Sequence, residues 1–112
     1  MMKRISLLMI LALALPALAA AEDWSNVSIV DTQCSTKVKA DPDSHTRDCA
    51  LTCAKSGFGI LDKDGNYLKF DDKGNQEALR LLQNTSKKDH LRVNVTGSKE
   101  GGVIHVQSVK MS

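Results

Sequence analysis

The C-terminal part of the chain alternates apolar and polar residues with a period of two, and this pattern strongly restricts the fold. In HLRVNVTG, residues 90–97, Leu91, Val93 and Val95 alternate with polar residues, and VIHVQSVKM, residues 103–111, continues the alternation. Successive side chains of a β-strand point to opposite faces, so this pattern is typical of a strand with one buried face. The sequence therefore predicts two half-buried strands joined by a turn in SKEGG.

Three further strands are predicted upstream. NVSIVDTQC, residues 26–34, is dominated by β-branched residues, which favour a strand that ends at Cys34. FGIL and YLKF, residues 58–61 and 67–70, flank an Asp64-Gly65 pair, which is a strong signal for a hairpin turn. The chain is therefore expected to form five short strands.

Two helices are predicted between these strands. The first is expected over residues 42–56, because Asp41 can cap it, Pro42 suits its first turn and Gly57 can end it. The second is expected over residues 75–83, where the apolar residues recur at helical spacing: Ala78, Leu79, Leu81 and Leu82.

The order of these elements predicts the fold class. Five short strands hide their edges when they close into a barrel, and a helix between the third and fourth strands is the arrangement of the OB-fold. We expect a mainly β protein, with a five-stranded OB-like barrel. A cysteine-bearing helix would lie between strands 1 and 2, and a short helix between strands 3 and 4.

The first 21 residues are typical of a secretory signal peptide. Lys3 and Arg4 precede an apolar run over residues 5–15, and Ala19-x-Ala21 provides a cleavage site. Residues 22–112 would then form a single OB-like domain, periplasmic or secreted, with no membrane anchor after cleavage. Disulfides persist in such compartments, and all three cysteines lie in this part of the chain.

The charge balance restricts the partners. The formal net charge of the whole chain is +2, and Lys3 and Arg4 account for it, so the exported part is neutral. It lacks the positive field on which nucleic-acid binding relies, and no nucleic-acid partner is expected. No catalytic triad, phosphate loop or pair of catalytic carboxylates can be assembled from the motifs. We therefore expect a non-enzymatic small-barrel protein that binds an unknown ligand or partner, or serves in envelope stress.

The cysteines offer three interpretations. Cys34 ends the first predicted strand and Cys53 precedes the second, so antiparallel pairing favours a Cys34–Cys53 disulfide, with Cys34–Cys49 as the alternative. A zinc or copper site is the second interpretation, because thiolate and imidazole suit both metals. Its ligands would be Cys34 and Cys49 with either His45 or Cys53, since His45 and Cys53 lie about 12 Å apart along a continuous helix. A thiol–disulfide redox role for Cys49 is the third.

Three segments carry a resemblance to known proteins. DPDSHTRDCALTCAKSGFGIL, DGNYLKFDDKGN and VNVTGSKEGGVIHVQSVKM together resemble a family of small exported bacterial proteins of unknown function that carry a Cys-x-x-x-Cys-x-x-x-Gly segment. The tail is also similar to the periplasmic bacterial OB-fold family. The resemblance implies export and a barrel, and it implies no activity.

Overall fold

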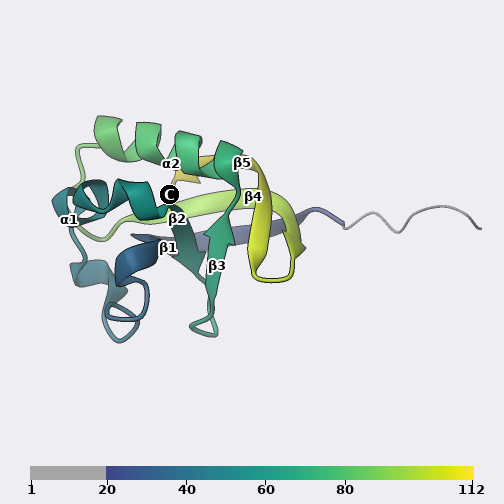
Figure 1. The fold of residues 1–112 in the computed structure, drawn as a ribbon, viewed down its shortest axis with the longest axis horizontal. Helices are drawn as coiled ribbons and strands as arrows, with labels where there is room; N and C mark the ends of the chain where they lie inside the picture. Colours follow the sequence, from purple (N-terminus) through teal and green to yellow (C-terminus); the bar gives the residue numbers. More distant parts are fainter. Residues whose placement is uncertain (1–19) are drawn as a thin grey trace, which may run out of the picture.

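The computed structural model describes residues 20–112, which form a closed five-stranded barrel (Figure 1). The strands are β1 (Glu22–Asp31), β2 (Phe58–Leu61), β3 (Tyr67–Phe70), β4 (Arg92–Glu100) and β5 (Val103–Met111), and they are neighbours in the order β1-β2-β3-β5-β4. The expected mainly β, OB-like barrel is therefore confirmed. The predicted signal peptide falls almost entirely on residues 1–19, outside the described residues.

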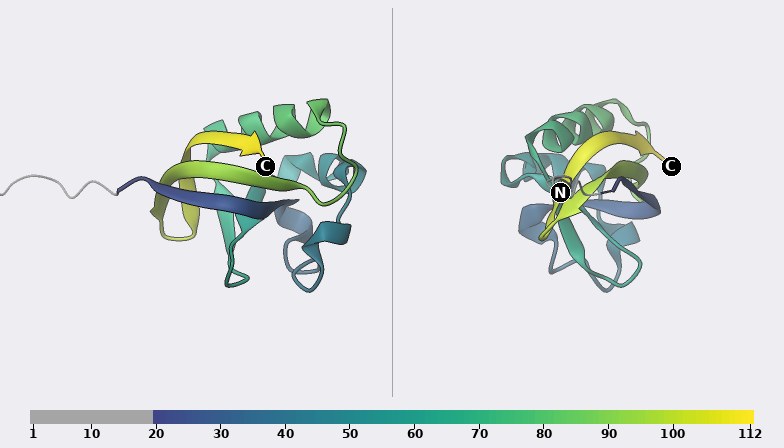
Figure 2. Two further views of the ribbon diagram at one scale, coloured as in Figure 1. Left: turned by 180° about the vertical axis from the view of Figure 1, so that it is seen from behind. Right: turned by 90° about the vertical axis from the view of Figure 1, so that its right-hand side faces the viewer.

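Antiparallel pairing builds most of the barrel, and one parallel pair closes it. β1 pairs with β2 on one side and with β4 on the other, and β4 pairs with β5 along nearly its whole length. Parallel pairing of β3 with β5 joins the ends of this sheet through Lys69–Val103 and Phe70–Ile104. The barrel is seen nearly end-on in the right-hand view of Figure 2.

In β4 the core residues are those that the alternating pattern assigns to one face, whereas a β-bulge in β5 shifts the pattern, so Ile104 and Val106 are buried before it and Val109 after it. Val93 and Val95 of β4 are almost fully buried, and Asn94 between them is exposed. Their neighbours in the core come from the other four strands and both helices: Val27, Ile29, Phe58, Ile60, Leu68, Phe70, Ile104, Val106, Val109, Ala50, Ala78 and Leu82. Burial of this apolar surface is the main force that holds the barrel together.

Helix α2 (Asp72–Asn84) follows β3 in the chain, packs mainly against β5 and also against β2 and β3, and lies at the top of Figure 1. It begins three residues before the predicted start, because Asp71 caps it by accepting a hydrogen bond from the Gly74 N–H at 3.0 Å. Its residues Ala78 and Leu82 face the barrel and are fully buried. The predicted second helix is therefore confirmed in kind and is longer than expected.

The predicted continuous helix over residues 42–56 is wrong. The chain instead forms a 3₁₀ turn at Pro42–Ser44, helix α1 (Arg47–Thr52) and a 3₁₀ turn at Ala54–Ser56. His45 and Thr46 are extended, and the Thr46 hydroxyl caps α1 by accepting from the Cys49 N–H at 3.2 Å. Asp41, the expected cap, makes no capping side-chain bond. A better N-cap inside the segment therefore starts a separate, shorter helix.

The first strand also differs from the prediction at both ends. β1 starts at Glu22 and ends at Asp31, so Cys34 lies on a 3₁₀ turn, Thr32–Cys34, that follows the strand. Asp31 causes this ending, because its side chain accepts a hydrogen bond from the Cys34 N–H and caps the turn. The hairpin arms and the last strand match their predicted bounds.

Gly74 provides a test of how tightly α2 sits on the barrel. Alanine normally stabilises a helix relative to glycine. At this position, however, a Cβ atom would lie 2.5 Å from Val106 Cγ2 and 2.8 Å from Phe70 Cβ. We therefore expect Gly74→Ala to lower the free energy of unfolding by about 1–3 kcal/mol, as overpacking does. Urea denaturation followed by circular dichroism measures this change, and a stabilised variant would contradict the close packing.

Candidate metal centre

The candidate site is built around Asp31, the last residue of β1. Its side chain follows Val27 and Ile29 along the inner face of the strand, and it is fully buried, with 0% of its side chain exposed. A buried carboxyl group requires hydrogen-bonding partners. Asp31 Oδ2 accepts from the Cys34 N–H at 3.0 Å, and Asp31 Oδ1 shares a hydrogen bond of 2.7 Å with His45 Nε2.

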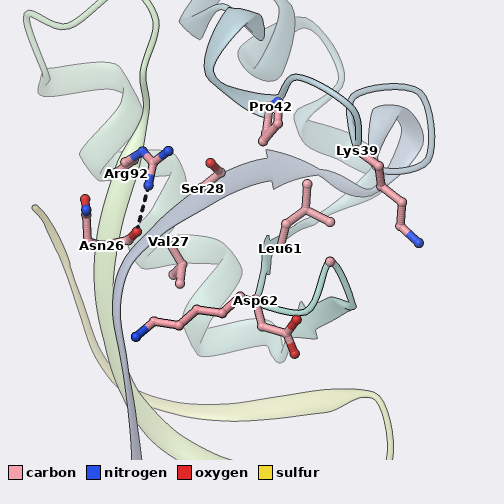
Figure 3. A pocket seen from close by; sticks show the side chains of 10 residues that line it. Asn26, Val27, Ser28, Lys39, Pro42, Leu61, Asp62 and Arg92 are labelled. Carbon is pink, nitrogen blue, oxygen red and sulfur yellow. Dashed lines mark hydrogen bonds between the residues drawn. The ribbon is translucent and has the colours of Figure 1, made fainter.

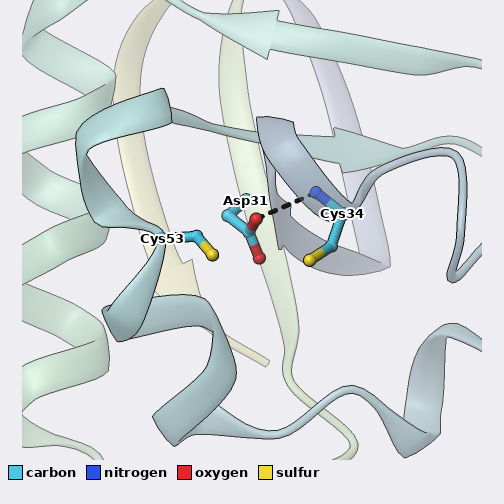
Figure 4. Close-up of side chains that lie close together, drawn as sticks. All are labelled: Asp31, Cys34 and Cys53. Atoms are coloured by element: carbon cyan, nitrogen blue, oxygen red, sulfur yellow. Dashed lines mark hydrogen bonds between the residues drawn. The ribbon is translucent and has the colours of Figure 1, made fainter.

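Cys34 and Cys53 approach Asp31 from two different segments, as Figure 4 shows. Cys34 ends the turn that Asp31 caps, and Cys53 is the C-cap of α1. One ligand atom from each of the three residues, a carboxylate oxygen and two sulfurs, lies within 4.8 Å of the others. Among the described residues, this is the group of histidine, cysteine and acidic side chains that could hold a metal ion.

Backbone hydrogen bonds hold the two cysteine segments side by side. The Thr32 N–H donates to the Gly57 carbonyl at 2.8 Å, and the Gln33 N–H donates to Ser56 Oγ at 3.1 Å. Gly57 has a φ of 86°, which favours glycine and lets the chain turn from the cysteine segment into β2. The proximity of Cys34 and Cys53 is therefore a property of the backbone fold.

His45 is placed by contacts on both sides of it. Asp43 accepts two hydrogen bonds from the Arg92 guanidinium, at 3.0 and 2.9 Å, and this interaction lowers the pKa of the Asp43 carboxyl. The Arg47 N–H donates to the Lys88 carbonyl at 2.8 Å. These bonds fix the extended segment at residues 45–46, so the His45 ring points inward and only 5% of its side chain is exposed.

The thiol of Cys34 sits in an environment that disfavours its ionised form. Desolvation raises its pKa, and the nearby Asp31 and Cys53 side chains raise it further. A cation bound between these three groups would reverse the balance, because it attracts both thiolates and the carboxylate. The local electrostatics therefore favour either a neutral Cys34 thiol or a bound positive ion.

The ligand types and spacing suit a small tetrahedral ion. Zinc binds thiolate sulfur at about 2.3 Å and carboxylate oxygen at about 2.0–2.2 Å, which puts neighbouring ligand atoms about 3.5 Å apart. Side-chain rotations of modest size bring three atoms within 4.8 Å to that separation. Asp31 is hydrogen-bonded to the Cys34 N–H and to His45, and hydrogen bonds of this kind orient a carboxylate that binds a metal ion.

The structure does not bring the predicted metal set of Cys34, His45 and Cys49 together. His45 Nε2 is bonded to Asp31 and belongs outside the ligand group. Cys49 is exposed and does not join the cluster in the described part of the chain. The break before α1 is the reason, because His45 and Cys49 do not share one helix. The alternative set of Cys34, Cys49 and Cys53 shares Cys34 and Cys53 with this cluster, in which Asp31 is the third member.

Asp31 was missed as a site residue although the sequence carries a signal for it. It occupies an inward-facing position in the alternating pattern of Val27 and Ile29, where an acidic residue needs a partner. A carboxylate at the buried end of a strand, three residues before a cysteine, is therefore a candidate ligand. The position of Cys53 beside it depends on the path of the backbone over residues 35–57.

A shallow pocket of about 250 Å³ opens beside the cluster. It is lined by Cys34, Asp48, Cys49, Thr52 and Cys53, so all three cysteines border the same hollow. Cys49 is the exposed one, whereas Cys34 and Cys53 are half-buried. Solvent and small ligands therefore have a route to the two sulfurs of the cluster.

A second pocket of about 250 Å³ lies on the outer face of β1, shown in Figure 3. Its charged groups are partly engaged in the fold. Asp62 Oδ1 accepts the N–H groups of Asp64 and Asn66 in the hairpin turn, and Arg92 binds Asp43. This pocket therefore offers fewer free polar groups for a ligand than its lining residues suggest.

Comparison with known proteins finds no similar protein. No protein-family model, curated protein or solved structure gives a significant match. Within residues 20–112, none of the helices is both long and apolar enough to cross a membrane. Function is therefore argued from the site itself.

Proposed function

We propose that this protein is a non-enzymatic, exported small-barrel binding protein whose ligand is a thiophilic metal ion, zinc or copper(I). The ligands are Asp31, Cys34 and Cys53. The observation that carries the proposal is the convergence of one carboxylate oxygen and two sulfurs within 4.8 Å, on three segments that the barrel holds in place. The signal-peptide pattern of residues 1–21 and the resemblance to exported bacterial proteins support the location.

The ligand chemistry favours these two metals over the hard cations. Magnesium and calcium prefer oxygen ligands, six or more for calcium, and here two of three ligand atoms are sulfur. Zinc accepts a mixed sulfur and oxygen set, and copper(I) favours the thiolates. Three protein ligands leave a fourth position of a tetrahedral zinc site open toward the pocket that Cys49 borders.

Metal titration of the reduced protein tests the proposal. We expect one equivalent of zinc to bind, and we expect Cys53→Ser to weaken binding by more than about 100-fold, because it removes a ligand rather than an outer partner. Cys49→Ser is the matched control, since it removes a thiol that lines the same pocket but lies outside the ligand group, and it should leave affinity within about threefold of the native value. Competition with a chromophoric chelator measures zinc affinity, and a copper(I)-specific chelator gives the corresponding value for copper.

Cobalt substitution reports the ligand type independently. A cobalt(II) ion bound to thiolates produces a sulfur-to-metal charge-transfer band in the near ultraviolet, and Cys34→Ser and Cys53→Ser should each weaken it. Absence of metal binding by the reduced protein would refute the proposal. Equal loss of affinity in Cys49→Ser and Cys53→Ser would place the ion elsewhere.

A further inference from the structure

The sulfur pair at the proposed metal centre has a second chemical option. Cys34 and Cys53 have sulfur atoms within 4.8 Å of each other and come from segments already joined by hydrogen bonds. A disulfide needs a sulfur–sulfur distance of about 2.05 Å and a close approach of the two backbones. Both side chains are half-buried and free, and rotation about their side-chain bonds would bring the two sulfurs closer together.

We propose that Cys34 and Cys53 form a disulfide under oxidising conditions, and that this bridge and the bound metal ion exclude each other. The oxidation state of the pair would thus set the metal occupancy of the barrel. This inference rests on the proposed metal-binding function, and it assigns the regulation of the same site.

The disulfide and the bound metal ion exclude each other because both require the sulfur atoms of Cys34 and Cys53. A metal ion binds thiolates, and a disulfide sulfur has no thiolate to offer. Once Cys34 and Cys53 are joined, Asp31 is the one ligand of the three that remains, and its oxygens already accept from Cys34 N–H and contact His45. A single buried carboxylate does not retain zinc or copper(I) against a chelator.

The exchange reaction is balanced with a small-molecule disulfide as oxidant, such as oxidised glutathione. The thiolate of one cysteine attacks the oxidant and releases one glutathione thiolate, leaving a mixed disulfide. The thiolate of the other cysteine then attacks the protein sulfur of that mixed disulfide and releases the second glutathione. The protein loses two electrons and two protons, and the oxidant becomes two molecules of reduced glutathione.

Cys49 is the cysteine that stays free. It is exposed, and its sulfur lies outside the cluster that joins Cys34 to Cys53. Cys49 and Cys53 lie four residues apart along the end of α1, so their side chains run side by side instead of facing each other. The fold therefore distinguishes one bridging pair among three thiols.

The test uses the Cys49→Ser variant, in which Cys34 and Cys53 are the remaining cysteines. We expect oxidised glutathione to remove both free thiols, to lower the intact mass by two hydrogen atoms, and to release the bound zinc completely. Zinc-loaded protein should oxidise at least tenfold more slowly than metal-free protein, since the metal occupies both thiolates. A reductant should restore one equivalent of binding.

Peptide mapping of the native chain identifies the pair. Trypsin separates Cys34 from the other two cysteines, but residues 48–55 contain no internal cleavage site and carry both Cys49 and Cys53. Fragment ions, or comparison of Cys49→Ser with Cys53→Ser, must therefore assign the partner. A Cys34–Cys49 or Cys49–Cys53 bridge would overturn the proposal, and so would zinc retained by protein whose Cys34–Cys53 bridge is complete.

The two proposals fail in different ways. Reduced protein that binds no metal refutes the metal-binding function, whatever its disulfides do. Reduced protein that binds metal but forms no Cys34–Cys53 bridge with the oxidant refutes the switch alone.

Discussion

Replacing Asp31 with alanine is expected to lower the free energy of unfolding by about 2–5 kcal/mol. The carboxyl group is fully buried and serves two partners, the Cys34 N–H and the ring of His45. Alanine leaves both without a partner in a region that water reaches poorly, and it also leaves a cavity at the end of the barrel. Chemical denaturation of the reduced, metal-free protein measures this loss apart from any effect of a bound ion.

Two control variants separate the causes of this loss. Asp48→Ala removes a carboxylate with 87% of its side chain exposed, and it should change stability by no more than about 0.5 kcal/mol. Asp31→Asn preserves the shape and part of the hydrogen bonding, so it should be less destabilising than alanine while still weakening zinc binding. If Asp31→Ala unfolds with the same midpoint as Asp48→Ala, the buried carboxyl group is not a structural centre.

Truncation of Leu82 to alanine should lower the free energy of unfolding by about 2–5 kcal/mol. Leu82 has 0% exposure and lies on the buried face of α2, where it belongs to the single core cluster of the barrel. The lost methyl groups leave a cavity between α2 and the strands, which well-packed neighbours refill incompletely. Thermal and urea unfolding of the reduced protein measure the loss.

The neighbouring residue supplies the comparison for Leu82. Gln83 is exposed on the same helix, so Gln83→Ala leaves the core intact and slightly favours the helix. Its unfolding midpoint should match or exceed that of the native protein. A Leu82→Ala variant as stable as Gln83→Ala would show that α2 contributes little to the barrel.

The sequence predicts the barrel well because its strands carry local signals that tertiary packing does not override. Residues 103–111 form β5 with the predicted bounds although a β-bulge near Gln107 interrupts their alternation, and Asp64-Gly65 lies in the turn between the two hairpin arms. The strand order includes two hairpins, β2–β3 and β4–β5, and one crossover from β3 to β4 that contains α2. The strands and the hairpin turn depend on neighbours in the chain, which a sequence pattern records directly, whereas the β1–β4 and β3–β5 pairings join residues far apart in the sequence.

The candidate site is less predictable because it depends on where a helix begins. Thr46 and Asp41 are both good capping residues, and the sequence alone does not decide between them. The choice of Thr46 turns His45 inward to Asp31 and separates it from Cys49. A change of a few residues in one helix start therefore replaces the expected ligand group. The closeness of Cys34 and Cys53 agrees with the expectation from antiparallel pairing of β1 and β2, since Cys34 follows β1 and Cys53 precedes β2.

The parallel contact between β3 and β5 has a consequence for how the barrel moves. It consists of two residue pairs, Lys69–Val103 and Phe70–Ile104, whereas β4 and β5 pair along eight. Local opening is easiest where backbone hydrogen bonds are few. We therefore expect β3 and β5 to separate transiently before any other pair of neighbouring strands in the barrel. The proposed metal ligands lie on β1 and on the segments between β1 and β2, away from the contact between β3 and β5. The strand contact that opens most easily, between β3 and β5, is therefore distant along the barrel order from Asp31, Cys34 and Cys53, whose relative positions the proposed metal site requires.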